Sequence, residues 1–362
     1  MEIIQDIQNH FRGLDTVRYV NTATSGLLSN TVLAWRKDHD LDYATHGSEK
    51  KVQTEQILSQ LRETLGDCFG CHPQNIALVP SFSVGVNLLL EGLGPSEKVV
   101  LLEQEYPSLN WAFQNRGFTI DMLPITGNLE EIVYNHIRRS GATVLACSMV
   151  QWLNGIQLGV DFFKQLKRDF PALLIVVDGT QYCGVAEFDF LASGIDIFGT
   201  SGYKWLLAGY GNGFFLVRES AKERFSLKAM GYGSGRNAKE NRMERTFCKH
   251  LETGHLDSLS FGSLYHSLHF LKTIGFKGIG DHNTAISKAA KTIFTDLGIL
   301  EDRVKQRKNH SSIFNIQIDS AMHKRLLENG IVCARRGGGT RLSFHFYNTP
   351  ADLEAIITVL KA

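Results

Sequence analysis

The stretch that decides the fold reads Thr200-Ser201-Gly202-Tyr203-Lys204-Trp205-Leu206-Leu207-Ala208-Gly209-Tyr210-Gly211-Asn212-Gly213. It follows an apolar run that includes Ile195, Ile197 and Phe198, and it precedes another at residues 214–217, a pattern typical of two buried strands. Lys204, its only charged residue, therefore lies between two apolar segments. Burial favours the uncharged form of a lysine amine, and the uncharged amine attacks aldehydes to form a Schiff base.

Two hydroxyl side chains, Ser201 and Tyr203, flank Lys204 and add hydrogen-bond donors for a ligand. The glycines of the stretch allow the backbone to approach a ligand closely. The alternative is a surface turn with a solvated lysine, because lysine and glycine are both common in turns. The stretch alone does not decide between the two.

A second buried strand is predicted upstream, where residues 172–177 form a continuous apolar run that ends in Asp178-Gly179-Thr180-Gln181. A carboxylate at a strand end can keep the ring nitrogen of pyridoxal phosphate protonated, and that proton is what makes the ring withdraw electrons. The alternative is that Asp178 caps the loop that follows.

These residues resemble a known family. Val177–Gln181 followed by Ser201–Lys204 is similar to the class V aminotransferases, the branch of fold type I enzymes that includes cysteine desulfurases. Arg341–Thr349 also resembles the carboxyl-terminal Arg-x-Ser-x-x-x-Tyr-Asn-Thr motif of that family. The three motifs occur in the family's order, and the resemblance runs from about Tyr19 to the end of the chain.

The resemblance implies an α/β protein of the fold type I pyridoxal-phosphate class. We expect a large domain over residues 15–240 with a mainly parallel sheet of the seven-stranded type, and a smaller α+β domain from residues 1–14 and 241–362. It implies pyridoxal 5'-phosphate as cofactor, bound through a Lys204 aldimine, with Asp178 at the ring nitrogen.

The cofactor phosphate is expected where a helix begins, after Val79-Pro80-Ser81-Phe82-Ser83. Helix N-termini present free N–H groups and a positive dipole end, which together bind anions. We expect Ser83 and the amide of Phe82 to bind the phosphate, with Ser81 beside them. Plain capping of the helix by Ser81 or Ser83 is the alternative and is compatible with phosphate binding.

Two further cofactor contacts come from the resemblance. Relatives place an aromatic ring, often histidine, flat on the pyridine, and Tyr106 occupies this position; tyrosine can stack but does not exchange protons at neutral pH as histidine does. Relatives bind the phenolic oxygen with a side chain at the position of Trp152. We therefore expect Gln181 to take over, with Gln151 and Asn154 as alternatives.

The substrate side is predicted from Arg341, whose planar guanidinium can bind both oxygens of an α-carboxylate. A surface arginine is the alternative. Arg335 and Arg336, beside a run of glycines, are candidates for binding a second acidic group of the substrate. Residues 19–26 resemble the family's segment over the active site, so Asn21 and Thr24 are expected to contact substrate, or else to form an ordinary polar turn.

The reaction is predicted to be transamination. Cysteine desulfurases carry a nucleophilic cysteine shortly before the Arg-x-Ser motif, and residues 334–340 contain none. Cys333 is expected inside a buried strand. The alternatives are a desulfurase or selenocysteine lyase, an amino-acid epimerase or lyase, and a catalytically silent protein that only binds; loss of Lys204 or Asp178 would indicate the last, and both are present.

The remaining predictions concern partners and location. His255 follows Gly254 where relatives carry a Gly-Thr that reaches the phosphate of the other subunit, so a homodimer is expected. The net charge is +1, and neither a dense basic run nor a long apolar run is present, so neither nucleic acid nor a membrane is predicted as partner. Six scattered cysteines favour a cytoplasmic protein. A zinc site at Cys68 and Cys71 would need two more ligands, and only His72 is near in sequence, so the end of a helix is favoured and zinc is the alternative.

Overall fold

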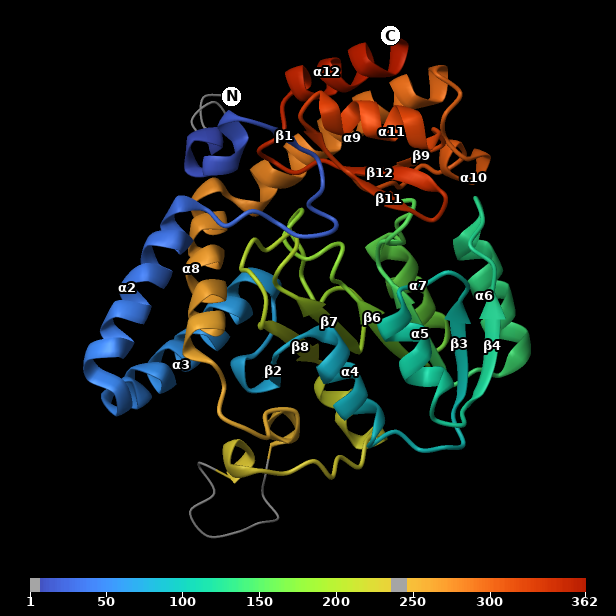
Figure 1. Ribbon diagram of the computed structural model, residues 1–362. Helices are drawn as coiled ribbons and strands as arrows, with labels where there is room; N and C mark the ends of the chain where they lie inside the picture. Colours follow the sequence, from blue (N-terminus) through green and yellow to red (C-terminus); the bar gives the residue numbers. More distant parts are fainter. Residues whose placement is uncertain (1–6, 236–245) are drawn as a thin grey trace.

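The computed structural model describes residues 7–235 and 246–362. Its centre is a seven-stranded sheet with the strand order β2-β8-β7-β6-β5-β3-β4 (Figure 1). Strand β8 runs antiparallel to both of its neighbours, and the other neighbouring strands are parallel. This confirms the predicted mainly parallel sheet. The strands are β2 (Ile76–Val79), β3 (Lys98–Leu102), β4 (Thr119–Leu123), β5 (Val144–Ser148), β6 (Leu174–Asp178), β7 (Ile197–Ser201) and β8 (Gly213–Val217).

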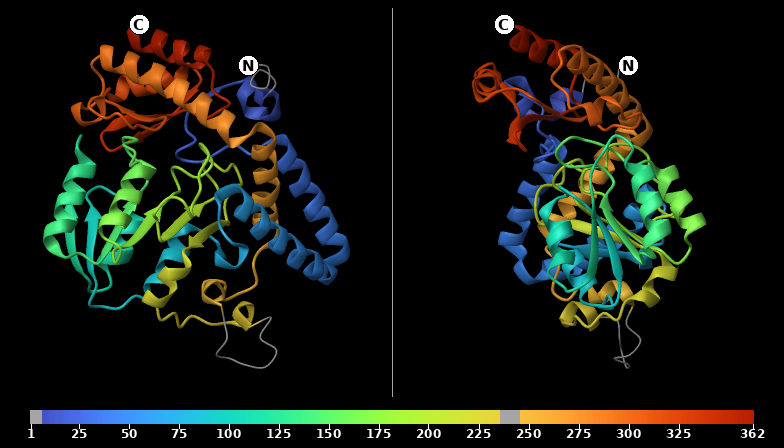
Figure 2. Two further views of the ribbon diagram at one scale, coloured as in Figure 1. Left: turned by 180° about the vertical axis from the view of Figure 1, so that it is seen from behind. Right: turned by 90° about the vertical axis from the view of Figure 1, so that its right-hand side faces the viewer.

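The central strands are buried along their whole length because helices cover both faces of the sheet (Figure 2). Successive side chains of a strand point to opposite faces, so each strand contributes to two cores. In β6, Ile175 and Val177 belong to one cluster of buried side chains and Val176 belongs to the other. A strand buried in this way needs apolar side chains on both of its faces, which explains the continuous apolar run at residues 172–177.

The α-helices of the described residues are given by their bounds: α2 (Asn30–His46), α3 (Lys50–Phe69), α4 (Phe82–Leu90), α5 (Pro107–Gln114), α6 (Leu129–Ser140), α7 (Val160–Asp169), α8 (Ser258–Ile274), α9 (Phe276–Asp296), α10 (Asp302–Lys305), α11 (Ser320–Glu328) and α12 (Pro350–Lys361). Helix α8 packs against α2 and α3 (Figure 1). None of the helices in the described ranges is both long and apolar enough to cross a membrane.

The carboxyl-terminal part of the chain contains a second, smaller sheet. Strands β9 (Ile313–Ile316), β11 (Ala334–Arg336) and β12 (Gly339–Ser343) make an antiparallel sheet in the order β11-β12-β9. A short strand near the amino terminus, β1 (Arg18–Tyr19), pairs in parallel with β10 (Ile331–Val332). The predicted boundary at residues 240 and 241 lies outside the described residues, as do residues 1–6, and the division into two domains stays a prediction.

Two predicted strands in this part are placed differently. We expected a strand at residues 342–347, but β12 ends at Ser343. The strand begins earlier than expected because Gly337 and Gly338 adopt positive φ angles of 51° and 84° and close a hairpin in which Gly339 already pairs with Arg336. It ends at Ser343 because this residue pairs with Ile313, the first residue of β9. Cys333 follows β10 instead of lying within it, although its side chain is buried as expected.

Candidate active site

A cavity of about 200 Å³ lies at the carboxyl ends of β5, β6 and β7. Parallel strands end at the same edge of a sheet, and Ser148 and Asp178 are direct neighbours in the pairing of β5 with β6. The cavity is lined by Ser81, Phe82, Ser83, Tyr106, Ser108, Ser148, Val150, Trp152, Asp178, Thr180, Gln181, Ser201, Tyr203, Lys204 and Tyr210. The structure thus brings together the predicted catalytic and cofactor-binding residues, except His255.

Lys204 follows β7 and is 6% exposed. Burial lowers the pKa of its amine to about 7, and the positive charge of Arg341 adds to the effect. Within the described residues the amine forms no hydrogen bond and no ion pair; its Nζ lies 5.3 Å from the centre of the Tyr106 ring and 5.6 Å from that of Tyr203. A large fraction of the amine is therefore uncharged near neutral pH.

Asp178 ends β6 and is buried. Its Oδ1 accepts a hydrogen bond of 2.8 Å from the backbone N–H of Thr180. Burial raises the pKa of Asp178, while the hydrogen bonds from Thr180 and the charge of Lys204 oppose this rise. A buried carboxylate with an open side toward the cavity can bind a cationic ring N–H group.

Glu105 is a buried carboxyl group in contact with Ser148 of the cavity wall, and the sequence motifs did not indicate it. It accepts hydrogen bonds from the backbone N–H of Ser148 (2.7 Å) and from its hydroxyl (2.6 Å). Burial raises the pKa of Glu105 to about 7, against the hydrogen bonds from Ser148, and the negative charge of Asp178 raises it further. The sequence feature that could have indicated Glu105 is its position between the end of β3 and Tyr106.

The start of helix α4 forms another wall of the cavity. Ser81 caps the helix by accepting a hydrogen bond from the N–H of Val84 (3.3 Å), as the capping alternative predicted. The N–H of Phe82 donates to the hydroxyl oxygen of Ser201 (2.9 Å). The hydroxyl of Ser83 donates to Ser108 Oγ (2.6 Å), so two hydroxyls meet at the positive end of the helix.

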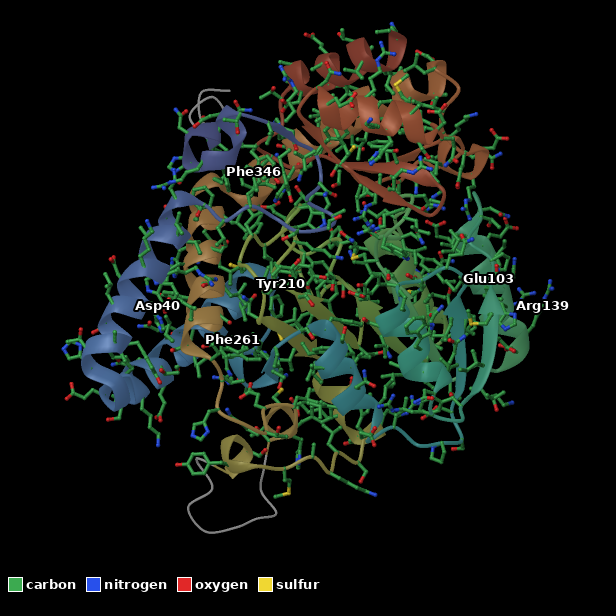
Figure 3. The ribbon with its side chains drawn as sticks, viewed as in Figure 1. Asp40, Glu103, Arg139, Tyr210, Phe261 and Phe346 are labelled. Atoms are coloured by element: carbon green, nitrogen blue, oxygen red, sulfur yellow. The ribbon has the colours of Figure 1, made fainter. Side chains whose placement is uncertain are left out.

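Aromatic rings surround the lysine. Tyr106 contacts Trp152 edge to face, with ring centres 5.4 Å apart. Tyr203 stacks on Tyr210 with ring centres 4.4 Å apart, and Tyr210, labelled in Figure 3, is 65% exposed at the mouth of the cavity. Burial raises the pKa of Tyr203, so its hydroxyl stays protonated at neutral pH.

Gln181 lines the cavity, but both ends of its amide already have partners. Its Nε2 donates to the carbonyl oxygen of Ala23 (3.0 Å), and its Oε1 accepts from the indole N–H of Trp205 (2.7 Å). Gln181 can therefore donate only the second hydrogen of its Nε2 to a ligand.

The predicted substrate residues lie together beside the cavity. Arg341, 2% exposed, donates to the carbonyl oxygen of Trp152 and to the hydroxyl oxygen of Thr24, both over 2.7 Å. The Thr24 hydroxyl in turn donates to Asn21 Oδ1 (2.7 Å), and the Nε atom of Arg341 is buried without a partner in the described residues. Close approach of this segment requires Gly26, since a Cβ there would lie 2.1 Å from the carbonyl oxygen of Lys204.

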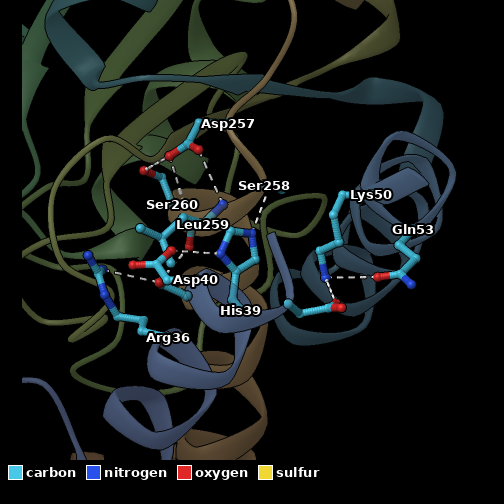
Figure 4. Close-up of polar contacts among 11 residues, drawn as sticks. Arg36, His39, Asp40, Lys50, Gln53, Asp257, Ser258, Leu259 and Ser260 are labelled. Atoms are coloured by element: carbon cyan, nitrogen blue, oxygen red, sulfur yellow. Dashed lines mark hydrogen bonds and ion pairs between the residues drawn. The ribbon is translucent and has the colours of Figure 1, made fainter. Parts of the chain in front are cut away.

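His255 is the predicted residue that lies elsewhere. It borders a separate cavity of about 820 Å³, and its ring stacks on that of Tyr232 with centres 4.9 Å apart. Figure 4 shows the polar contacts nearby, where His39 bonds to Ser258 and Asp257 caps the start of α8. In one chain, therefore, His255 is not part of the cavity that holds the buried lysine.

This set of side chains fits pyridoxal phosphate. The cavity offers an amine with a pKa near neutrality, a buried carboxyl group, a flat ring, and paired hydroxyls at a helix start. These groups match an aldehyde, a ring nitrogen, an aromatic face and a phosphate, respectively.

Comparison with known proteins identifies the family. The profile of the aminotransferase class-V family matches residues 18–356. The uncharacterized aminotransferase YcbU of Bacillus subtilis is 25% identical over 311 residues, which cover 83% of this chain and 82% of the relative. Isopenicillin N epimerase of Amycolatopsis lactamdurans is 28% identical over 182 residues, which cover 46% of this chain and 45% of the epimerase.

The apo structure of a cysteine desulfurase from Thermococcus onnurineus NA1 superimposes with a TM-score of 0.85 at 18% identity, over 99% of this chain and 97% of that one, and so shows the shared fold. The family profile covers most of the chain, and the residues at the sheet edge suit the cofactor of that family. The chain therefore belongs to the class V aminotransferase family and is a pyridoxal-phosphate-dependent enzyme that acts on an amino acid.

Proposed function

We propose that this enzyme is an aminotransferase, which moves the amino group of an α-amino acid to a 2-oxo acid. The observation that carries the proposal is the Lys204 amine, which is buried, has a pKa near 7 and forms no hydrogen bond or ion pair within the described residues. Such an amine can be both the attachment point for an aldehyde and the carrier of one proton.

When bound, pyridoxal phosphate withdraws electrons from the α-carbon of the substrate through its protonated ring. Asp178 would hold that ring proton in place, because a buried carboxylate stabilises a protonated ring nitrogen by its charge and by a hydrogen bond. The ring of Tyr106 would hold the cofactor by aromatic contact. The Nζ atom of Lys204 would accept the proton from the substrate α-carbon and hold it for return, while the cofactor would supply the carbon that receives this proton. Hydrolysis by one water would then release the 2-oxo acid and leave the amino group on the cofactor.

Phosphate binding is assigned to the start of α4. The hydroxyls of Ser83 and Ser108 now bond to each other and can turn toward a phosphate. The N–H of Phe82 is already engaged by Ser201, so its predicted role would require that hydrogen bond to break. For the phenolic oxygen we retain Gln181, through the second hydrogen of its Nε2.

Arg341 is proposed to bind the α-carboxylate of the substrate. Two of its nitrogens are held by Trp152 and Thr24, which fixes the plane of the guanidinium, and its buried Nε has no partner in the described residues. A fixed, under-bonded guanidinium next to Lys204 suits a carboxylate that must be presented in one orientation.

Desulfuration is the second candidate, favoured by the likeness to cysteine desulfurases. It requires a thiolate to accept sulfur, and none of the six cysteines, all within the described residues, lines the cavity. Burial raises the pKa of Cys333 to about 12, so its thiol stays protonated. Transamination requires no thiol, which is why it is preferred.

We further propose a homodimer in which His255 of one subunit completes the cofactor site of the other. The support is the position of His255, on an open cavity away from the lysine of its own chain. In this arrangement the imidazole would supply one more donor to the phosphate.

The proposed function is tested by mixing the cofactor-loaded enzyme with single amino acids and analysing one turnover. An aminotransferase yields one equivalent of 2-oxo acid per site, and a second 2-oxo acid as acceptor restores continuous turnover. An epimerase would instead invert the amino acid with no acceptor and no oxo acid, and a desulfurase would release sulfide from cysteine. Either result would overturn the proposal.

A further inference from the structure

The hairpin formed by β11 and β12 presents two arginines on one face. In its register Ala334 pairs with Arg341, and Arg336 pairs with Gly339. Directly paired residues share a face and side chains alternate along a strand, so Arg336 and Arg341 lie on the same face as diagonal neighbours, with Cβ atoms within about 7–8 Å. Arg335, paired with Thr340, points to the other face.

The face with the two arginines contacts the wall of the cavity through Arg341. Arg341 donates to the carbonyl oxygen of Trp152, a residue that lines the cavity, and its guanidinium lies 5.9 Å from the centre of the Trp152 ring. A Cβ on Gly337, next to Arg336, would lie 3.0 Å from Leu153. The tip of the hairpin therefore rests on the turn that follows β5.

Neither guanidinium is neutralised by a carboxylate within the described residues. Arg341 donates to a carbonyl and a hydroxyl oxygen, and the exposed Arg336 donates to the carbonyl oxygen of Arg335 (2.9 Å). The two charges also act on each other: burial and then the charge of Arg336 lower the pKa of Arg341 to about 10. Arg336 also lowers the pKa of Lys204, after burial and Arg341.

Two cations on one face of a hairpin that packs against the wall of the cavity repel each other until anions bind between them. One anion is the α-carboxylate assigned to Arg341. We propose that the substrate is an α-amino acid with a second acidic group, such as glutamate or aspartate, and that Arg336 binds this group. The inference rests on the proposed function and names the substrate class of the same site.

The opposite face of the hairpin provides the matched control. The guanidinium of Arg335 donates to the carbonyl oxygens of Ile318 (2.8 Å) and Gly338 (3.1 Å), which anchors the hairpin away from the cavity. Replacing Arg335 can loosen the hairpin, but it should affect acidic and neutral substrates equally. The ratio of kcat/KM for acidic over neutral amino acids therefore distinguishes loss of a contact with the acidic group from a general loss of structure.

The test measures kcat/KM of the cofactor-loaded enzyme for glutamate, aspartate, glutamine and norvaline. Wild type should prefer an acidic amino acid over its neutral counterpart by tenfold or more. Arg336→Ala should lower kcat/KM for the acidic amino acid by about 10- to 100-fold and for the neutral one by less than about threefold, the range for one charge-assisted contact. Arg336→Lys should retain part of the preference, and Arg335→Ala should leave the ratio unchanged.

A binding measurement with glutarate, an unreactive dicarboxylate, makes the outcome independent of turnover. Calorimetry should show glutarate binding that weakens by about tenfold or more in Arg336→Ala and stays the same in Arg335→Ala. If no amino acid reacts, the proposed function fails, while glutarate binding still decides the role of Arg336. An unchanged acidic-to-neutral ratio together with unchanged glutarate affinity in Arg336→Ala would overturn the inference.

Discussion

Replacing Lys204 with methionine should stabilise the protein in the absence of cofactor, and the gain should depend on pH. Burial lowers the pKa of the amine from 10.5 to about 7 in the folded protein. At about 1.4 kcal/mol per pKa unit, keeping the charged amine buried costs about 5 kcal/mol. Methionine has a similar length and no charge, so Lys204→Met removes this cost.

The sign of the pH dependence follows from the protons bound in each state. Between pH 7 and 10.5 the folded protein has lost the proton of Lys204 and the unfolded chain still holds it, so wild-type stability rises with pH across this window. Below pH 7 both states are protonated and the cost is complete. The advantage of Lys204→Met should therefore be largest below pH 7 and vanish near pH 10.5.

The assay is urea denaturation of cofactor-free protein at several pH values from 6 to 10, for wild type, Lys204→Met and Lys288→Met. Lys288 lies exposed on α9 and serves as the matched control, so its replacement should leave the pH profile of wild type unchanged. A stability difference between wild type and Lys204→Met that stays constant over this pH range would refute the argument, because it would mean that the amine is ionised normally.

Three further predictions concern the substrate, the thiol and the assembly. Arg341→Ala should lower amino-acid turnover by tens to hundreds of fold, since a bidentate carboxylate contact is worth about 2–4 kcal/mol, while the cofactor absorbance stays the same; unchanged single-turnover kinetics would remove the proposed role. Wild type and Cys333→Ala should both release negligible sulfide from cysteine in a colorimetric assay, and strong release that Cys333→Ala abolishes would make the enzyme a desulfurase. Sedimentation with saturating cofactor should give about twice the chain mass of 40.4 kDa, and His255→Ala should weaken cofactor binding; a monomer with full cofactor affinity would contradict this.

The large sheet was predictable because buried parallel strands have a distinctive pattern. The apolar run at residues 172–177 and its polar end indicated β6 and Asp178, and the charged residue between two apolar runs indicated Lys204. The limits of the strands in the smaller sheet were harder to predict from the sequence. The positive φ angles of Gly337 and Gly338 decide the register of β12, and a run of glycines is compatible with several turn types.

The sequence did not predict the parts of the site that depend on neighbours distant in the chain. Ser148 contributes because β5 is paired in register with β6, and Glu105 contributes because its side chain turns toward Ser148. The hydrogen bond from Phe82 to Ser201, which engages the amide predicted to bind the phosphate, likewise joins two segments 119 residues apart. Pairings of this kind depend on the tertiary fold, which patterns along one strand do not contain.

The most direct test of the account is to identify the residue that carries the cofactor. Purified protein with pyridoxal phosphate should be yellow, and treatment with borohydride should fix the cofactor to the peptide that contains Lys204, as seen by mass spectrometry after proteolysis. Lys204→Ala should lose this labelling and still bind the cofactor reversibly. Labelling of a different lysine, or none despite saturating cofactor, would contradict the central claim.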